Sequence, residues 1–284
     1  MGRKREDQGR RTTRRDVRVL LSLLLSLPVV TPAGAFLPSV SPAKAGHYVQ
    51  TTTAAPQVQL PDEDAFFDAV RENMARSNRE QYRYAYKERR TELHTNPFGR
   101  LGTGDIVVYD VTPGPTPSVT FRRLLEKNGK PVTDSKPERQ ERRVRTGGKS
   151  STDDTVESLR FALDRRETVD GRRAIVVRFE PRREAKPETR EGRLAKAFRG
   201  LIWVDEEARE VLRVEATAVD DLSYGFGLLA RVRKGSMVTL TRQRIDEHIW
   251  LPTSIKFKGD GRALLALRKL NIDFAVEWFD YRRM

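Results

Sequence analysis

The sequence contains no cysteine among its 284 residues and only three histidines. Without thiols the chain can form no disulfide, zinc–thiolate site, iron–sulfur cluster or thiol nucleophile. A lipid-modified N-terminus also needs a cysteine at its cleavage site, so a lipoprotein is excluded. His47, His94 and His248 are not spaced with carboxylates as metal ligands would be. We therefore expect no metal site and no cofactor.

Catalytic signatures are missing as well. The chain has no G-x-S-x-G elbow, and the adjacent acids Asp153-Asp154 and Asp220-Asp221 would diverge on a helix or a strand. Gly147-Gly148-Lys149-Ser150 lacks the first glycine of a phosphate-binding loop, and no apolar strand precedes it. The sequence therefore predicts a protein without catalytic residues. An exported hydrolase with acids from distant strands is the weaker alternative.

Long hydrophobic runs are missing, with one short exception near the N-terminus. A basic stretch over residues 3–18 precedes an apolar run of twelve residues over 19–30. Twelve residues are too few to span about 30 Å of hydrocarbon as a helix. The small residues Ala33 and Ala35 then supply a cleavage pattern, which predicts a secretory signal peptide cut after Ala35. The basic stretch contains an arginine pair, so export by the twin-arginine route is an alternative to the general secretion route.

The rest of the chain divides into a lead-in and one domain. Residues 36–60 contain scattered prolines and three consecutive threonines, which predicts a flexible segment. Residues 61–284 are numerous enough to bury a core without disulfides. They contain no run of about 18 apolar residues, so we expect no transmembrane helix. After removal of residues 1–35, the protein is expected in the periplasm.

The charge of the chain is strongly basic. The net charge is +14, of which the predicted signal peptide carries +5 and the rest of the chain +9. A basic balance suits anionic partners such as nucleic acid or a membrane surface. Because an exported protein rarely meets nucleic acid, we favour an anionic membrane surface. A solvated, arginine-rich surface without a partner is the alternative.

Alternating strand patterns dominate the region from Tyr82 to Tyr281. They are clearest over residues 270–278, where every second side chain is large and apolar. Asn128-Gly129 and Asp170-Gly171 are typical hairpin turns, and Gly259-Asp260-Gly261 is predicted to turn into the last strand. About ten antiparallel strands are expected. A sheet of that size twists, curls and tends to close or half-close around its apolar face.

Helices are predicted at a few points of this mainly β, α+β chain. Residues 61–64 combine a proline with three acids, which is typical of a helix start, and apolar residues recur at helical spacing to about Ser77. Two polar insertions cover 133–155 and 181–196. We expect a solvated helix over 137–145 and a short helix at the end of the second insertion. These helices would cap the sheet.

Several motifs in order carry a family resemblance. They are Gly171-Arg172-Arg173-Ala174-Ile175, Gly200-Leu201-Ile202-Trp203-Val204-Asp205, Glu210-Val211-Leu212-Arg213 and Trp250-Leu251-Pro252-Thr253. Over residues 62–284 the chain resembles the periplasmic lipoprotein carrier and receptor superfamily of outer-membrane lipoprotein sorting. The resemblance implies an unclosed β-barrel with a helical lid, whose hydrophobic cavity holds the acyl chain of a lipid or lipoprotein. The implied function is non-catalytic transport or sorting in the cell envelope.

The apolar residues of the strands and helices supply the candidate site. The side chains expected to line the cavity are Tyr82, Tyr84, Tyr86, Val177, Phe179, Trp203, Trp250, Ile272, Phe274, Val276 and Trp278. Those expected in the lid are Phe66, Phe67, Val70, Leu194 and Phe198. The same residues could instead fill a core. In that alternative the chain is a structural or envelope-interaction protein, and its Arg-rich insertions bind an anionic polymer or a protein partner.

Overall fold

The computed structural model describes residues 59–95, 101–141, 151–224, 230–261 and 270–284. The predicted signal peptide, its cleavage residues Ala33 and Ala35, and nearly all of the lead-in lie outside the described residues. Ile272 belongs to a described strand, but its side chain is not among those described.

Most of the described chain forms one antiparallel sheet of twelve strands. Its strands are β1 (Tyr84–Thr95), β2 (Leu101–Pro113), β3 (Val119–Lys127), β4 (Lys130–Pro131), β5 (Glu138–Glu141), β6 (Leu159–Val169), β7 (Arg172–Pro181), β8 (Phe198–Asp205), β9 (Val211–Ala218), β12 (Met237–Asp246), β13 (Ile249–Gly261) and β14 (Leu270–Arg283). Two short strands, β10 (Leu222–Tyr224) and β11 (Ala230–Val232), pair separately.

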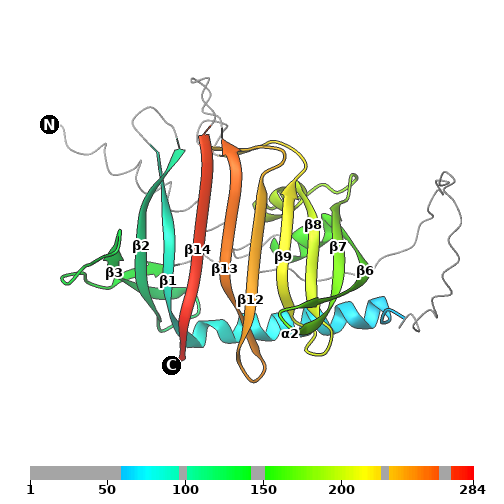
Figure 1. The fold of residues 1–284 in the computed structure, drawn as a ribbon, viewed down its shortest axis with the longest axis horizontal. Helices are drawn as coiled ribbons and strands as arrows, with labels where there is room; N and C mark the ends of the chain where they lie inside the picture. Colours follow the sequence, from blue (N-terminus) through cyan, green and yellow to red (C-terminus); the bar gives the residue numbers. More distant parts are fainter. Residues whose placement is uncertain (1–58, 96–100, 142–150, 225–229, 262–269) are drawn as a thin grey trace, which may run out of the picture.

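The spatial order of the strands shows that the sheet is open. The order is β4-β3-β2-β1-β14-β13-β12-β9-β8-β7-β6, and β5 also pairs with β3. The last strand of the chain thus lies between the first strand and β13 (Figure 1). The two ends of the order do not pair with each other among the described residues. The predicted mainly β fold with an unclosed, curved sheet is therefore confirmed.

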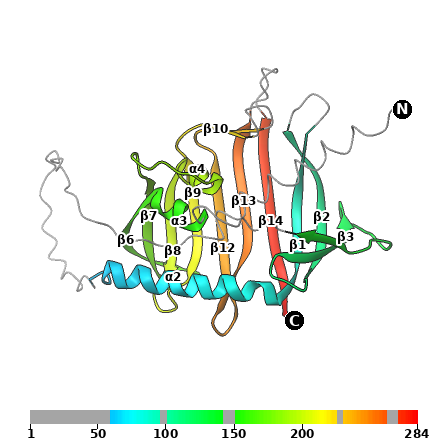
Figure 2. The same cartoon turned by 180° about the vertical axis from the view of Figure 1, so that it is seen from behind.

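Helices cover one face of this sheet. They are α2 (Glu63–Glu80), α3 (Ser151–Glu157) and α4 (Arg190–Ala195), and a 3-10 turn, η1 (Gln81–Arg83), follows α2. Asp62 caps α2, because its Oδ1 accepts a hydrogen bond of 2.9 Å from the backbone N–H of Ala65. Figure 2 shows α2 running across the strands, with α3 and α4 over the same face. The predicted N-terminal helix is confirmed, and it extends one turn beyond Ser77.

The hairpin turns follow from residues that tolerate positive φ. Asn128 and Gly129 have φ values of 51° and 75°, and Asp170 and Gly171 have 49° and 78°. Two consecutive left-handed residues are the requirement of the tightest hairpin turns. These two turns were predicted correctly from the sequence.

Two local predictions were wrong. Residues 138–141 are not helical but form β5, which pairs with the outer part of β3 from Val119 to Arg122. A polar helix has no apolar face to bury, whereas the open edge of β3 offers backbone hydrogen bonds. The turn at 259–261 is also misplaced, because β13 continues to Gly261, which pairs with Leu270.

Candidate functional site

One large apolar cluster lies between α2 and the sheet face that the helix crosses. The helix contributes Phe66, Phe67, Val70 and Met74, each at most 3% exposed. Seven neighbouring strands, from β6 across to β14, contribute the other side. The helical spacing on one side and the two-residue alternation on the other bring these residues onto facing surfaces.

Most residues predicted for the site meet in this cluster. The predicted lid residues Phe66, Phe67, Val70, Leu194 and Phe198 all belong to it, although Phe198 lies in β8 rather than in a helix. The predicted lining residues Val177, Phe179, Phe274, Val276 and Trp278 belong to it as well. All ten side chains are buried. The helices α2 and α4 and the sheet therefore enclose these side chains together.

Trp203 and Trp250 lie on the opposite face of the sheet. They pack with Ala174, Val176 and Leu212 in a separate cluster. The indole N–H of Trp203 donates to Glu167 Oε2 at 2.7 Å. Trp203 follows Ile202, which belongs to the large cluster, so strand alternation alone places the two residues on opposite faces. These two tryptophans do not face α2.

The three tyrosines predicted to line the cavity lie in different environments. Tyr82 belongs to η1 and is 42% exposed, because the strand begins only at Tyr84. Tyr84 donates from its hydroxyl to Asp246 Oδ2 at 3.0 Å. Tyr86 packs against the large cluster, and both Tyr84 and Tyr86 contact the ring of Tyr281.

Polar side chains fasten α2 to the sheet within this apolar region. Ser77 Oγ donates to Glu210 Oε1 at 2.8 Å and accepts from the backbone N–H of Trp250 at 3.2 Å. Arg242 Nη1 donates to Glu210 Oε2 at 3.2 Å. We call Ser77, Glu210 and Arg242 the polar latch. All three are at most 4% exposed, so the latch places an ion pair in apolar surroundings.

Burial controls the ionisation of the latch. It raises the pKa of Glu210 above the usual carboxyl value, although Arg242 and Ser77 act in the opposite direction. Burial likewise lowers the pKa of Arg242. A second polar contact lies one turn earlier in α2, where Asn73 Nδ2 donates to the carbonyl of Ala208 at 2.9 Å. The loop between β8 and β9 thus supplies partners for two successive turns of the helix.

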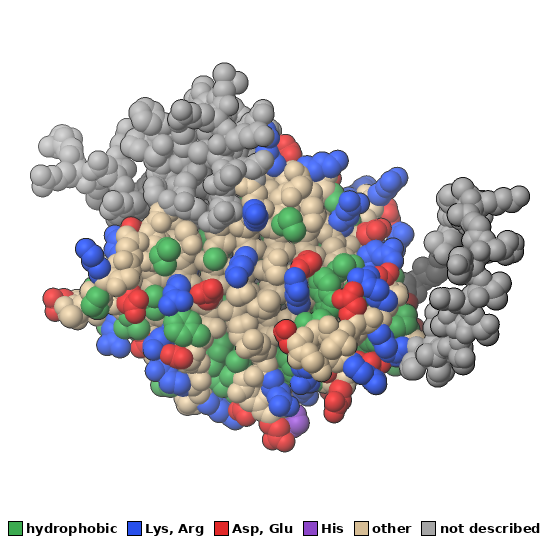
Figure 3. All heavy atoms as spheres, viewed as in Figure 1, with side chains coloured by type: hydrophobic (Ala, Val, Ile, Leu, Met, Phe, Trp, Pro, Cys, Tyr) green, Lys and Arg blue, Asp and Glu red, His purple; other side chains and the backbone are tan. Residues whose placement is uncertain are grey.

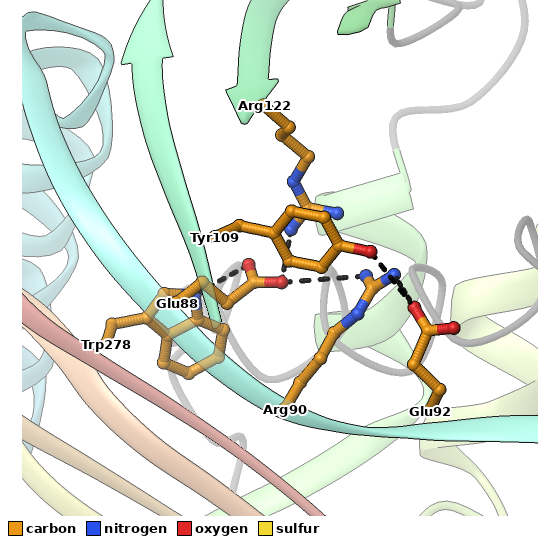
Figure 4. A network of polar contacts seen from close by, with 6 residues as sticks. All are labelled: Glu88, Arg90, Glu92, Tyr109, Arg122 and Trp278. Atoms are coloured by element: carbon orange, nitrogen blue, oxygen red, sulfur yellow. Dashed lines mark hydrogen bonds and ion pairs between the residues drawn. The ribbon is translucent and has the colours of Figure 1, made fainter. Parts of the chain in front are cut away.

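A charged cluster, which the sequence reasoning missed, follows the apolar cluster on the same sheet face. Glu88 in β1 lies opposite Trp278 in β14 and Tyr109 in β2, so the three side chains share that face. The charged cluster consists of Glu88, Arg90, Glu92, Tyr109 and Arg122 (Figure 4). A period-2 signal exists in the sequence, where Glu88, Arg90 and Glu92 alternate with Arg89 and Thr91.

The contacts in the charged cluster begin at Glu88, which is only 3% exposed. Its carboxylate accepts from Arg122 Nη2 and, at 3.2 Å, from the indole N–H of Trp278. Arg90 Nη1 lies 3.5 Å from the same carboxylate, and Arg90 Nη2 donates to Glu92 at 2.7 Å. Burial opposes the charge of Arg90, but Glu88 and Glu92 outweigh it and raise the pKa of Arg90.

Two further observations on the described residues concern metal binding and membrane spans. Within the described ranges, no three His, Cys, Asp or Glu side chains are grouped as a metal ion would need. None of the described helices combines the length and apolar character needed to cross a membrane. What the site offers is an enclosed apolar surface beside a polar latch and a partly buried group of charges.

Comparisons with known proteins concern the fold. No protein-family model matches the chain, and no curated protein matches its sequence. A crystal structure of a domain named for outer-membrane lipoprotein sorting, from Vibrio parahaemolyticus, is similar at a TM-score of 0.33 and 11% identity, covering 76% of this chain and 90% of that one.

Two other solved structures are similar to the same degree. A DUF1329 family protein from Desulfovibrio piger has a TM-score of 0.33 and 15% identity, over 77% of this chain and 92% of its own. A LolA superfamily protein from Nitrosomonas europaea has a TM-score of 0.31 and 13% identity, over 76% and 93%. Lipoprotein-sorting proteins are thus among those that the chain resembles. At these scores the likeness carries no argument about what this chain binds.

Proposed function

We propose that the chain is a non-catalytic binding protein of the cell envelope, which takes the acyl chain of a lipid or lipoprotein between α2 and the sheet. The observation that carries the proposal is the apolar face shared by seven neighbouring strands and covered mainly by one 18-residue helix. Movement of α2 would expose the part of the face that this helix covers. In this proposal α2 is a lid, and the acyl chain replaces its apolar contacts.

Such an exchange sets the burial of the acyl chain against the contacts that α2 loses. Each CH₂ group of an acyl chain contributes about 0.8 kcal/mol when it leaves water. An acyl chain in the place of Phe66, Phe67, Val70 and Met74 would cover the same strands. Opening also separates Ser77 from Glu210, which costs a buried hydrogen bond. The closed lid is therefore favoured without ligand, and the ligand supplies the compensation.

The proposed location is the periplasm, reached with the signal peptide over residues 1–35. The sheet face away from α2 carries Lys and Arg side chains with Asp and Glu among them (Figure 3). Several of these side chains form ion pairs. For example, Lys87 Nζ lies 2.7 Å from Asp280 Oδ2. We propose that the remaining positive charge holds the protein near anionic lipid headgroups.

The test is uptake of an acyl probe with the lid free or crosslinked. Asn73→Cys and Ala208→Cys introduce the only two thiols of the chain, at positions joined by a hydrogen bond between α2 and the β8–β9 loop. A short bismaleimide should then connect lid and sheet. We expect the uncrosslinked double variant to take up a fluorescent fatty acid and the crosslinked one to take up much less. Failure of the wild type to bind the probe, together with lipid-free native protein by mass spectrometry, would refute the proposal.

A second candidate function rests on the tightness of the same cluster. Phe67 and Val70 have no exposed surface, which also suits a permanently filled interior. The two insertions are joined, because Asp154 Oδ2 accepts from both the backbone N–H and the hydroxyl of Thr189 at 2.7 Å. In this candidate the insertions form a surface for an anionic polymer or a protein partner. Equal and negligible uptake with free and crosslinked lids would favour it.

A further inference from the structure

The charged cluster adjoins the apolar cluster directly. Trp278 belongs to both, since its ring packs in the apolar cluster and its indole N–H donates to Glu88 Oε2. A chain-like ligand along the apolar face would therefore bring one end close to Glu88, Arg90 and Arg122. Burial of the charges of Glu88 and Arg122 on this face costs free energy that a purely apolar core would avoid.

The donors and acceptors of the charged cluster are not balanced. The two oxygens of Glu88 already serve Arg122, Arg90 and Trp278, and Glu92 Oε1 accepts from Arg90 and, at 3.3 Å, from the hydroxyl of Tyr109. Arg122 is 8% exposed, and its Nη1 is enclosed without a hydrogen-bond partner among the residues that the structure describes. A buried donor of this kind is rare and calls for an acceptor.

We infer that the charged cluster binds the oxyanion headgroup of the acyl ligand, a carboxylate or a phosphate, with Arg122 as the principal donor. The inference rests on the proposed acyl-chain function and names the chemical class of ligand for it. A planar guanidinium suits either oxyanion, because two of its N–H groups can donate to one group of oxygens. Arg90 adds a second positive charge on the same face.

The half-buried ring of Tyr109 is the element that must move for this binding. The guanidinium carbons of Arg122 and Arg90 lie 5.2 and 5.1 Å from its centroid, so the ring contacts both cations (Figure 4). Rotation of Tyr109 would uncover Arg122 Nη1 without disturbing the contact between Arg122 and Glu88.

The experiment compares matched ligands on the purified protein by calorimetry. The ligands are dodecanoate, dodecyl phosphate and the uncharged methyl ester of dodecanoic acid. The wild type should bind at least one anionic ligand about tenfold more tightly than the ester, which corresponds to one charge-assisted hydrogen bond. The stronger of the two anions identifies the headgroup as carboxylate or phosphate.

Two variants locate the effect. Arg122→Gln should remove the preference, so that the anion and the ester bind with similar affinity. Arg123→Gln is the matched control, because Arg123 is the next residue in β3, is 51% exposed and pairs with Asp110. If Arg122→Gln fails to fold, Glu88→Gln with Arg122→Gln removes the unpaired carboxylate as well, and the same loss of preference is expected.

The outcomes separate this inference from the proposed function. Equal binding of anions and ester by the wild type, or equal effects of the Arg122 and Arg123 substitutions, would overturn the headgroup site and leave acyl binding intact. Absence of binding for all three ligands would overturn both. A loss of anion preference confined to Arg122 supports the inference.

Discussion

At the scale of single residues, the ion pair between Glu210 and Arg242 is the most consequential contact. Both side chains are almost fully buried, so their charges lack water and depend on each other. Such a pair stabilises little relative to an apolar pair of the same size, but the loss of one partner leaves an uncompensated charge. The latch is therefore sensitive to substitution of either residue.

Arg242→Met should lower the free energy of unfolding by about 3–5 kcal/mol, because Glu210 would keep a buried carboxyl group without its counter-ion. Arg89→Met is the control, since Arg89 and Glu277 form an exposed pair at 3.3 Å and such pairs contribute about 1 kcal/mol at most. Urea denaturation of both variants measures the difference. Similar losses in the two variants would mean that the latch has no special role in stability.

The carboxyl group of Glu210 also makes the free energy of unfolding depend on pH. Because burial raises the pKa of Glu210 above 4.5, the folded protein holds this proton to higher pH than the unfolded chain does. Between pH 4.5 and the raised pKa, the folded state binds more protons than the unfolded state. The free energy of unfolding therefore falls as pH rises through this window. Glu210→Gln should lack this decline. Urea denaturation of wild type and variant across that window checks it, and parallel curves would contradict it.

At the scale of elements, α2 depends on how its first turn is capped. Asp62→Ala should destabilise the protein by about 1 kcal/mol, because the backbone N–H of Ala65 would lose its acceptor, while Asp62→Asn should retain most of the stability. Asp68→Ala is the matched control, since Asp68 is an exposed acid of the same helix that pairs with Arg71. In thermal unfolding, Asp68→Ala should have a higher melting temperature than Asp62→Ala.

Elements governed by local chemistry could be predicted from the sequence. The start of α2 follows from Asp62 and its acidic neighbours, and the two hairpin turns follow from Asn128-Gly129 and Asp170-Gly171. β5 could not be predicted in this way, because its polar residues become a strand only beside the open edge of β3. Pairing between distant segments carries no local signal.

The candidate site was predictable in composition more than in orientation. Alternation marks which residues share a strand face, as for Ile202 and Trp203, but it does not identify which face meets the helix. That choice emerges only when seven strands and α2 are assembled. The charged cluster was harder still, since Glu88 and Arg122 are 34 residues apart and meet through the register of β1, β2 and β3.

At the scale of the whole molecule, the open sheet and its helix allow two states that a ligand would distinguish. If the native protein takes an acyl chain beneath α2, saturating dodecanoate should raise the free energy of unfolding, by about 2.7 kcal/mol at a hundredfold excess over Kd. If the interior is permanently filled, acyl chains reach the apolar face only after unfolding, and the same ligand should lower stability. Urea denaturation with and without dodecanoate measures the sign. The crosslinked Asn73→Cys, Ala208→Cys protein is the control, because a closed lid should remove any stabilisation while leaving the sheet unchanged.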